Sequence, residues 1–257
     1  MNALRSDDLT QRVAAIAAIR TAETATPAEV EDLVHCLGDA SKPIQRRAAD
    51  ALVVVQQGGV AVVECVRVAL HSPELRHRWG AAYALSRLGV AGAEVMPILL
   101  EVLGSDDGDR RWAAAGMLVG LAVQTDVGTA LRSMLTGDHP IARKMALYCW
   151  RDLGSRWSDG DTYLLKALAD ADAAVRLAAL SAVVTLAQDR DRLATACVRL
   201  LADSDLGVSR AAAVALGKLG SRSAMVQGAL RDATTSGDAA RARAARRALE
   251  RLMGAAA

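Results

Sequence analysis

The sequence predicts an all-α solenoid, in which pairs of helices stack side by side along the chain. Apolar side chains recur with a period of 33 residues, broken once by an interval of 32. We take as marker column the positions Leu52, Leu85, Leu118, Trp150, Val183, Leu216 and Leu249. A second column stands three residues after each marker, from Val55 to Leu252. A third column stands nineteen residues before each marker, from Leu33 to Leu230, and includes Cys197. Three columns in register over seven units predict a repeat protein.

The composition suits closely packed helices and argues against a β-sandwich or barrel. The chain has no Phe, only 3% aromatic residues and abundant alanine. Its net charge of +2 is uneven, since residues 1–128 carry −4 and residues 129–257 carry +6. The N-terminus shows no signal-peptide pattern and no apolar run is long enough to cross a bilayer, so we expect a cytoplasmic protein.

Cysteine usage and the absence of chemical motifs argue against a metal site or an active site. Cys36, Cys65, Cys149 and Cys197 are far apart and lack the spacing of zinc ligands, which predicts reduced, buried thiols. No nucleophile–base pair, phosphate-binding glycine loop or metal cluster stands out. We therefore predict no catalytic residue, metal or cofactor, and a binding protein is favoured over an enzyme.

The chain divides into a cap, seven repeats and a short tail. Residues 1–26 read as an N-terminal half-repeat, because Ile19 stands 33 residues before Leu52 and belongs to a second helix whose first helix is missing. Residues 255–257 form the tail, and the whole chain is expected to be one solenoid. The seven repeats are predicted at 27–59, 60–92, 93–125, 126–157, 158–190, 191–223 and 224–254.

Each repeat shows the signals that begin and end two helices. Acidic and hydroxyl residues gather in the short turn between the helices, as in Asp170-Ala171-Asp172, and glycine follows the second helix, as at Gly154 and Gly220. The fourth repeat departs from the pattern. It places Trp150 on the marker column and leads into an irregular loop over residues 155–161.

One repeat carries a recognisable family pattern. An Asp-x-Asp turn, an apolar–Arg pair, two alanines and a closing leucine resemble the HEAT repeat, most closely at Asp170, Asp172, Val175, Arg176, Ala179, Val183 and Leu186. The run Trp79 to Leu85 is similar to the subtype first described in phycobilisome lyases. The resemblance implies a right-handed solenoid whose second helices line a concave surface. It does not imply one function, because scaffolds, lyase subunits and DNA glycosylases share the repeat.

An arginine recurs seven positions before the marker, at Arg78, Arg111, Arg143 and Arg176. In a HEAT-like stack we expect these arginines to form a ladder between units with the turn aspartates Asp106, Asp138 and Asp172. A partly buried guanidinium needs paired acceptors, which favours a structural role.

The positions six and two before the marker are predicted to point away from the core, one helical turn apart. Most aromatic residues of the chain fall on them, with arginine and lysine nearby. We expect these residues to bind a partner on the concave surface: Arg46, Asp50, Trp79, Tyr83, Trp112, Lys144, Tyr148, Arg151 and Arg210. Gly80 and Gly116 beside them are expected to let a partner approach the backbone. The alternative interpretation is that Trp79 and Trp112 fill gaps between alanine-rich helices.

The sequence therefore favours a scaffold or adaptor that binds a protein or peptide on its concave surface, and the nearby arginine and lysine residues favour an acidic partner. One alternative is a chromophore or small-molecule lyase of the phycobilisome type, with a flat ligand on the aromatic residues. A less favoured alternative is a nucleic-acid protein that uses Lys144, Arg151, Arg210, Arg243 and Arg247, since a net charge of +2 is weak for that role. In the DNA glycosylases, a carboxylate accompanies the concave Trp, and Tyr83 and Gly116 stand here instead.

Overall fold

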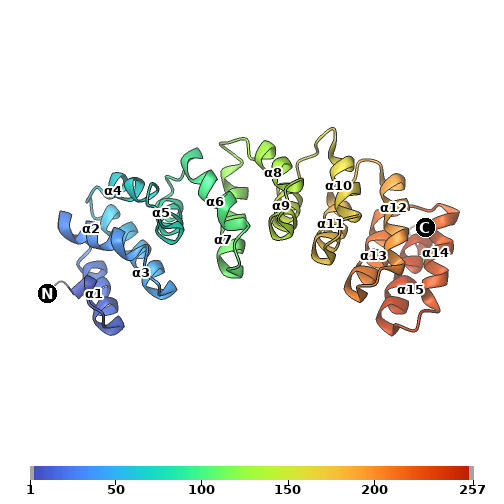
Figure 1. Cartoon of the computed structure of the whole chain (residues 1–257), viewed down its shortest axis with the longest axis horizontal. Helices are drawn as coiled ribbons and strands as arrows, with labels where there is room; N and C mark the ends of the chain where they lie inside the picture. Colours follow the sequence, from blue (N-terminus) through green and yellow to red (C-terminus); the bar gives the residue numbers. More distant parts are fainter. Residues whose placement is uncertain (1–2, 255–257) are drawn as a thin grey trace. The chain divides into compact units, whose positions relative to one another are not determined.

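The structure is a computed structural model that describes residues 3–254, and this part of the chain contains helices and no strand. Figure 1 shows the helices in chain order. The first half contains η1 (Ala3–Arg5), α1 (Leu9–Ala22), α2 (Pro27–Cys36), α3 (Lys42–Gln57), α4 (Val63–Ala69), α5 (Leu75–Arg87), η2 (Ala93–Val95), α6 (Met96–Leu103) and α7 (Gly108–Leu121). The second half contains α8 (Gly128–Leu135), α9 (Pro140–Leu153), α10 (Gly160–Leu168), α11 (Ala173–Leu186), α12 (Arg190–Arg199), η3 (Leu200–Ala202), α13 (Leu206–Leu219), α14 (Ala224–Thr234) and α15 (Ala239–Gly254).

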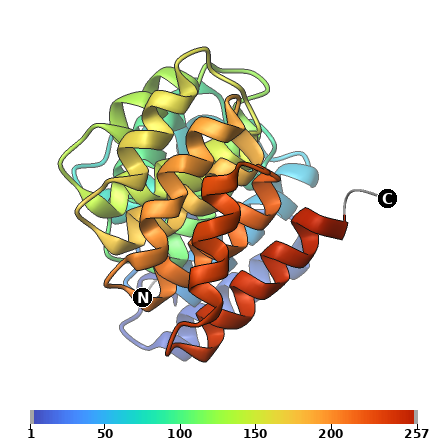
Figure 2. The same cartoon turned by 90° about the vertical axis from the view of Figure 1, so that its right-hand side faces the viewer.

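These helices form two compact units, each built as two layers of helices. One unit holds the residues up to Val102 together with Val123–Thr125, and the other holds Leu103–Ala122 and the residues from Asp126 onward. In the first unit, α1, α3 and α5 pack in sequence as the layer of second helices, and α2 packs on α4. In the second unit, α7, α9, α11, α13 and α15 form the corresponding layer, and α8, α10, α12 and α14 form the other. Figure 2 looks onto the end of the second unit, where α13, α14 and α15 lie together.

The all-α solenoid predicted from the sequence is confirmed, and the apolar columns form its core. All seven residues nineteen positions before the marker are buried, and so are six of the seven markers, Leu249 being half-buried. Burying a leucine-sized side chain contributes roughly 1.5–3 kcal/mol to the free energy of unfolding, so burial of these columns is a main source of the stability of the repeats. Among residues 3–254, no helix is both long and apolar enough to cross a bilayer. The predicted division into cap, repeats and tail stays a prediction, and residues 1–2 and the tail 255–257 lie outside the described residues.

Turn aspartates cap many of the helices. Asp8, Asp107, Asp172 and Asp205 each precede a helix and accept a hydrogen bond from its first backbone N–H groups. Such a cap is typically worth ~1 kcal/mol, because it satisfies donors that the helix itself leaves unpaired.

The expected arginine ladder is present in the second unit, but its acceptors differ from those predicted. Arg143 donates to both carboxylate oxygens of Asp170 at 2.8 Å, and Arg176 donates to Asp203 at 2.7 and 2.8 Å. The same two arginines also donate to backbone carbonyls of their own turns. Asp172, which was predicted to accept from a ladder arginine, does not do so, because its carboxylate caps α11. Each rung thus joins the turn of one repeat to the turn of the next.

Two arginines of the predicted ladder behave differently. Arg78 pairs with Glu101 at 2.7 Å, a glutamate on α6, and so uses neither Asp106 nor another turn aspartate. Arg111 donates to the carbonyl of Ser105 at 2.6 Å, and its buried Nε has no hydrogen-bond partner within the described chain. The fork-like pairs, in which two guanidinium nitrogens meet one aspartate, therefore begin with Arg143 on α9.

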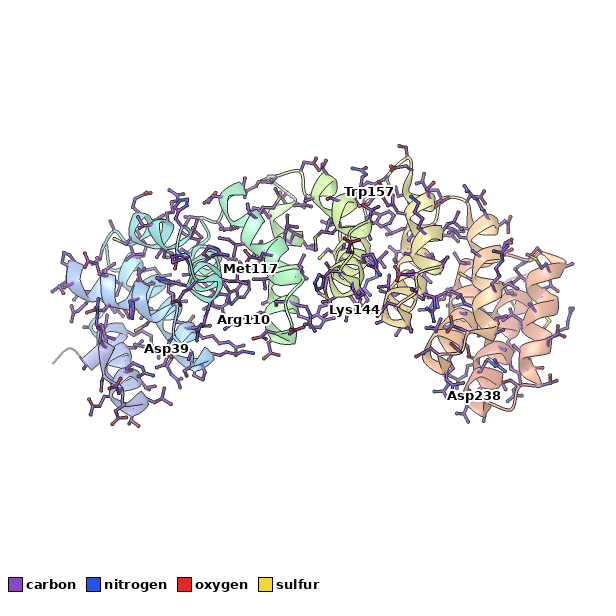
Figure 3. All side chains as sticks on the ribbon, viewed as in Figure 1. Asp39, Arg110, Met117, Lys144, Trp157 and Asp238 are labelled. Atoms are coloured by element: carbon purple, nitrogen blue, oxygen red, sulfur yellow. The ribbon has the colours of Figure 1, made fainter. Side chains whose placement is uncertain are left out.

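The irregular loop after α9 is held by stacked aromatic rings. Trp150 is buried on the marker column and stacks on Trp157, with ring centroids 4.1 Å apart and an interplanar angle of 4°. Arg132 covers Trp157 with its guanidinium 4.3 Å from the ring centroid, and Trp150 donates to the Ser155 carbonyl at 2.7 Å. Figure 3 labels Trp157 in this loop. These tryptophans are structural, which leaves Trp79 and Trp112 as candidates for a surface role.

Candidate functional site

The predicted partner-binding residues divide between the two units. Arg46, Asp50, Trp79 and Tyr83 lie on α3 and α5 of the first unit. Trp112, Lys144, Tyr148, Arg151 and Arg210 lie on α7, α9 and α13 of the second. We describe each group by itself.

Trp79 is buried, which corrects the expectation that it faces a partner. Its side chain is only 5% exposed and its ring lies 6.1 Å from that of half-buried Tyr83. The neighbouring Gly80 faces α2 rather than an incoming partner, because a Cβ there would lie 2.1 Å from the Leu37 carbonyl oxygen. Close approach of α5 to the end of α2 explains both observations. The burial of Trp79 agrees with the alternative interpretation, in which its ring fills a gap between helices.

The two predicted polar residues of the first unit, Arg46 and Asp50, do not form one site. Arg46 on α3 is exposed. Asp50 pairs with Arg87 of α5 at 2.8 Å, and both side chains are more than a third exposed. An exposed pair of this kind contributes little stability, about 0–1 kcal/mol. This face of α3 and α5 offers scattered charges around a buried aromatic ring.

Trp112 presents its ring to solvent, as expected, and packs against Tyr148 on the next second helix. The side chain of Trp112 is 53% exposed, and the two ring centroids are 5.2 Å apart at an interplanar angle of 32°. Tyr148 is half-buried and lies four residues after Lys144, which Figure 3 labels on α9. The pair therefore joins α7 to α9 and leaves one aromatic face open.

Arg151 is fixed beside this aromatic pair by three contacts. Its guanidinium lies 5.0 Å from the Tyr148 ring centroid, in the range of a cation–π interaction. It also donates to the hydroxyl of Ser181 at 2.8 Å on α11 and pairs with Asp152 at 2.7 Å. A cation held in this way needs little further ordering when an anionic group of a partner arrives.

An open groove continues from Tyr148 and Arg151 across α11 to α13. It has a volume of about 530 Å³, and its lining includes the aliphatic side chains of Leu177, Leu180, Val184 and Val214 with Ser181, Thr185 and Lys218 at polar positions. Leu177 and Val214 are 38% and 46% exposed. No acidic side chain lines this groove. Its chemistry suits an apolar segment that also carries acceptors or negative charge.

Arg210 is not a free cation on this surface, and its part in partner binding stays a prediction. It donates to both carboxylate oxygens of Asp238, at 2.6 and 3.1 Å, and so provides another rung of the ladder. Figure 3 labels Asp238 before α15. The ladder position of this repeat is Ser209, whose buried hydroxyl has no hydrogen-bond partner. The adjacent Arg210 supplies the missing guanidinium.

Comparison with known families finds a match over part of the chain. The model for HEAT repeats matches residues 30–119. Residues 30–119 therefore carry HEAT repeats. Comparison with curated protein sequences finds no match.

Solved structures with a similar arrangement support the all-α fold of this chain. An engineered protein is similar with a TM-score of 0.50 and 22% identity, over 98% of this chain and 79% of that one. Human deoxyhypusine hydroxylase in complex with glycerol has a TM-score of 0.42 and 17% identity, over 98% of this chain and 94% of its own. The first similarity shows an all-α solenoid, and the second carries no further argument.

Three of the four cysteine thiols are buried. Burial raises the pKa of Cys36 to about 11 and that of Cys149 and Cys197 to about 12, so these thiols stay protonated at neutral pH. Cys65 is exposed, contrary to the expectation of buried thiols. Among residues 3–254, no three His, Cys, Asp or Glu side chains gather so that they could hold a metal ion.

Sequence reasoning did not select the groove residues Leu177, Ser181, Val214 and Lys218, although a signal exists. Leu177, Ser181 and Val214 occupy the same two repeat columns as Trp112 and Tyr148, and Lys218 stands one turn beyond. The search for aromatic and basic residues passed over small and aliphatic members of those columns. Their exposure is what identifies them.

Proposed function

We propose that this HEAT-repeat protein is a scaffold that binds a protein partner through the second unit. The binding surface consists of Trp112, Tyr148 and Arg151 with the groove over α11 and α13. The observation that carries the proposal is the exposed ring of Trp112, packed on one side by Tyr148 and open on the other. Tryptophan, tyrosine and arginine are the residues that most often dominate binding energy in protein interfaces.

The helix that carries Trp112 also has an unusually bare surface. Gly116 and Gly120 follow Trp112 at intervals of one turn, and a Cβ at either position would meet nothing within 4 Å. Glycine inside a helix costs ~1 kcal/mol relative to alanine, and here no packing inside the protein requires it. This supports close approach of a partner to α7 beside the Trp112 ring.

The two alternative functions are less well supported by the same geometry. A lyase or chromophore carrier of the phycobilisome type would hold a flat ligand on the aromatic residues. Trp112 and Tyr148 contact each other, so such a ligand could stack only on the outer face of Trp112. A nucleic-acid groove would be expected to place phosphate-binding cations along its length, but aliphatic side chains line most of the groove beyond Arg151. We propose no enzymatic activity and no cofactor.

The test is recovery of partners with the tagged full-length chain from cells that naturally contain it, followed by quantitative mass spectrometry. We expect a defined protein that is recovered with the unaltered chain and lost with Trp112→Ala. The matched control is Val68→Ala with Met225→Ala, which removes exposed apolar side chains from α4 and α14. Equal recovery with Trp112→Ala, or a small molecule in the native mass spectrum of the purified protein, would contradict the proposal.

A further inference from the structure

The last helix carries a row of arginines that the rest of the protein does not neutralise. Arg243, Arg247 and Arg251 follow each other at intervals of one turn on α15 and line one groove against α13. Within residues 3–254, none of the three forms an ion pair or a side-chain hydrogen bond. The other two arginines of α15 have partners, since Arg241 donates to the Leu201 carbonyl and Arg246 to the Thr234 carbonyl.

Unlike the ladder arginines, Arg243, Arg247 and Arg251 do not stabilise the fold through ion pairs. Arg143, Arg176 and Arg210 each find a carboxylate in the next repeat. Like charges one helical turn apart repel each other and destabilise a helix slightly, so the row on α15 costs stability in the free protein. A negatively charged partner would remove that cost.

The floor of the groove is apolar and narrow. Val214, Ala240, Ala244 and Ala248 line it between the arginines, and Gly217 brings α13 close to α15. A Cβ on Gly217 would lie 2.8 Å from the Ala248 Cα, so the two backbones are nearly in contact. Arg243, Arg247 and Arg251 are all exposed, so the open side of the groove is accessible to a ligand.

We propose that this groove binds an acidic amphipathic helix of a protein partner, whose carboxylates pair with Arg243, Arg247 and Arg251. Carboxylates at matching one-turn intervals would meet arginines spaced ~6 Å apart along α15, and small apolar side chains would rest on the alanine floor. Arginine binds a carboxylate through two parallel hydrogen bonds, which gives both strength and orientation. A nucleic-acid backbone would satisfy the arginines but leave the apolar floor unused. The inference goes beyond the proposed scaffold function, because it adds a second binding surface on α15 and states the charge and shape of its ligand.

The test uses fluorescence anisotropy at physiological salt with the full-length protein and a labelled synthetic helical peptide of about 20 residues, long enough to hold a helix. The peptide carries glutamate at one-turn intervals along one edge of an alanine–leucine face, and a second peptide carries glutamine instead. We expect the glutamate peptide to bind at least about 10-fold more tightly than the glutamine peptide. The triple variant Arg243→Gln, Arg247→Gln, Arg251→Gln should lose that difference.

Matched variants separate a site from a general effect of positive charge. Arg192→Gln, Arg199→Gln and Arg222→Gln remove the same number of exposed charges from elsewhere in the second unit and should leave the affinity within about 2-fold. Val214→Asp should weaken binding by placing a carboxylate on the floor of the groove. Circular dichroism should show all variants helical. An equal loss in both triple variants, or equal affinity for the two peptides, would overturn the proposal.

Two further measurements keep this test separate from that of the scaffold function. Duplex DNA that binds more tightly than the glutamate peptide, and is lost in the α15 triple variant, would replace the acidic helix as the occupant. Trp112→Ala should leave affinity for the glutamate peptide unchanged, because Trp112 does not line this groove. Failure of the partner-recovery experiment would therefore not alter the peptide result, and the reverse also holds.

Discussion

Trp79 and Trp112 occupy the same repeat position, six residues before the marker, in consecutive repeats, yet one is 5% and the other 53% exposed. The residue one turn later also differs between the two repeats. Tyr83 follows Trp79 and lies against it, whereas Gly116 follows Trp112 and covers nothing. The comparison teaches that a repeat position sets the direction of a side chain, and that its neighbours decide whether solvent reaches it.

The largest expected effect is on stability when the buried ring is removed. Trp79→Ala should lower the free energy of unfolding by ~3–5 kcal/mol, because it leaves a cavity between α5 and its neighbours. Urea unfolding followed by circular dichroism measures this. Trp112→Ala is the matched control and should change the stability by no more than ~0.5 kcal/mol. Equal losses for the two variants would show that both rings fill gaps.

Acid should affect the unit of Trp112 through its arginine ladder. The hydrogen bonds from Arg176 hold the pKa of Asp203 below its usual range. A lowered pKa in the folded state stabilises the protein above the unfolded pKa of about 4, and this contribution is lost as the pH falls toward the folded value. Asp203→Asn should cost ~1.5–3 kcal/mol at pH 7.

The same variant should depend less on pH than the unaltered protein between pH 7 and pH 3. Thermal unfolding of both proteins across this range measures the difference. An identical pH dependence would show that the rung contributes nothing to folding. Asp189→Asn serves as a comparison for the loss of a carboxylate alone, because within residues 3–254 the Asp189 carboxylate caps α12 and pairs with no arginine side chain.

The two glycines beside the tryptophans should respond to alanine in opposite directions, and Gly80 should respond more strongly. Gly80→Ala places a methyl group against the Leu37 carbonyl and should destabilise the protein by ~1–3 kcal/mol, since α5 must move away from α2. Thermal and urea unfolding measure this change. A neutral result would mean that α2 and α5 separate at little cost.

Gly116→Ala should give the smallest change in stability, a gain of up to ~1 kcal/mol, because the added methyl group meets no atom of the protein and favours the helix. If a partner approaches α7 closely, the same variant should weaken partner recovery despite this gain. A gain in stability with unchanged recovery would remove Gly116 from the proposed surface.

Much of the fold was predictable because it depends on local periodicity. The 33-residue spacing placed the core columns, and buried residues such as Leu33, Leu52 and Leu131 lie where the spacing requires. The turn aspartates that cap helices were also predictable, since a cap depends only on the residues of its own turn. The exposure of the Trp112 ring was also predicted, from its position six residues before the marker.

Only the tertiary structure decided which side chain meets which across helices. The ladder could be expected, but Asp170 and Asp203 rather than Asp138 and Asp172 accept its hydrogen bonds, since an arginine reaches into the turn of the following repeat. Arg210 pairs with Asp238, and the ladder position beside it is a serine. Trp79 became core through the close approach of α2 to Gly80. The sequence by itself determined where each helix lies and which of its faces is apolar. Distances between helices depend on the side chains of both helices in a contact, so they cannot be read from the sequence of a single repeat.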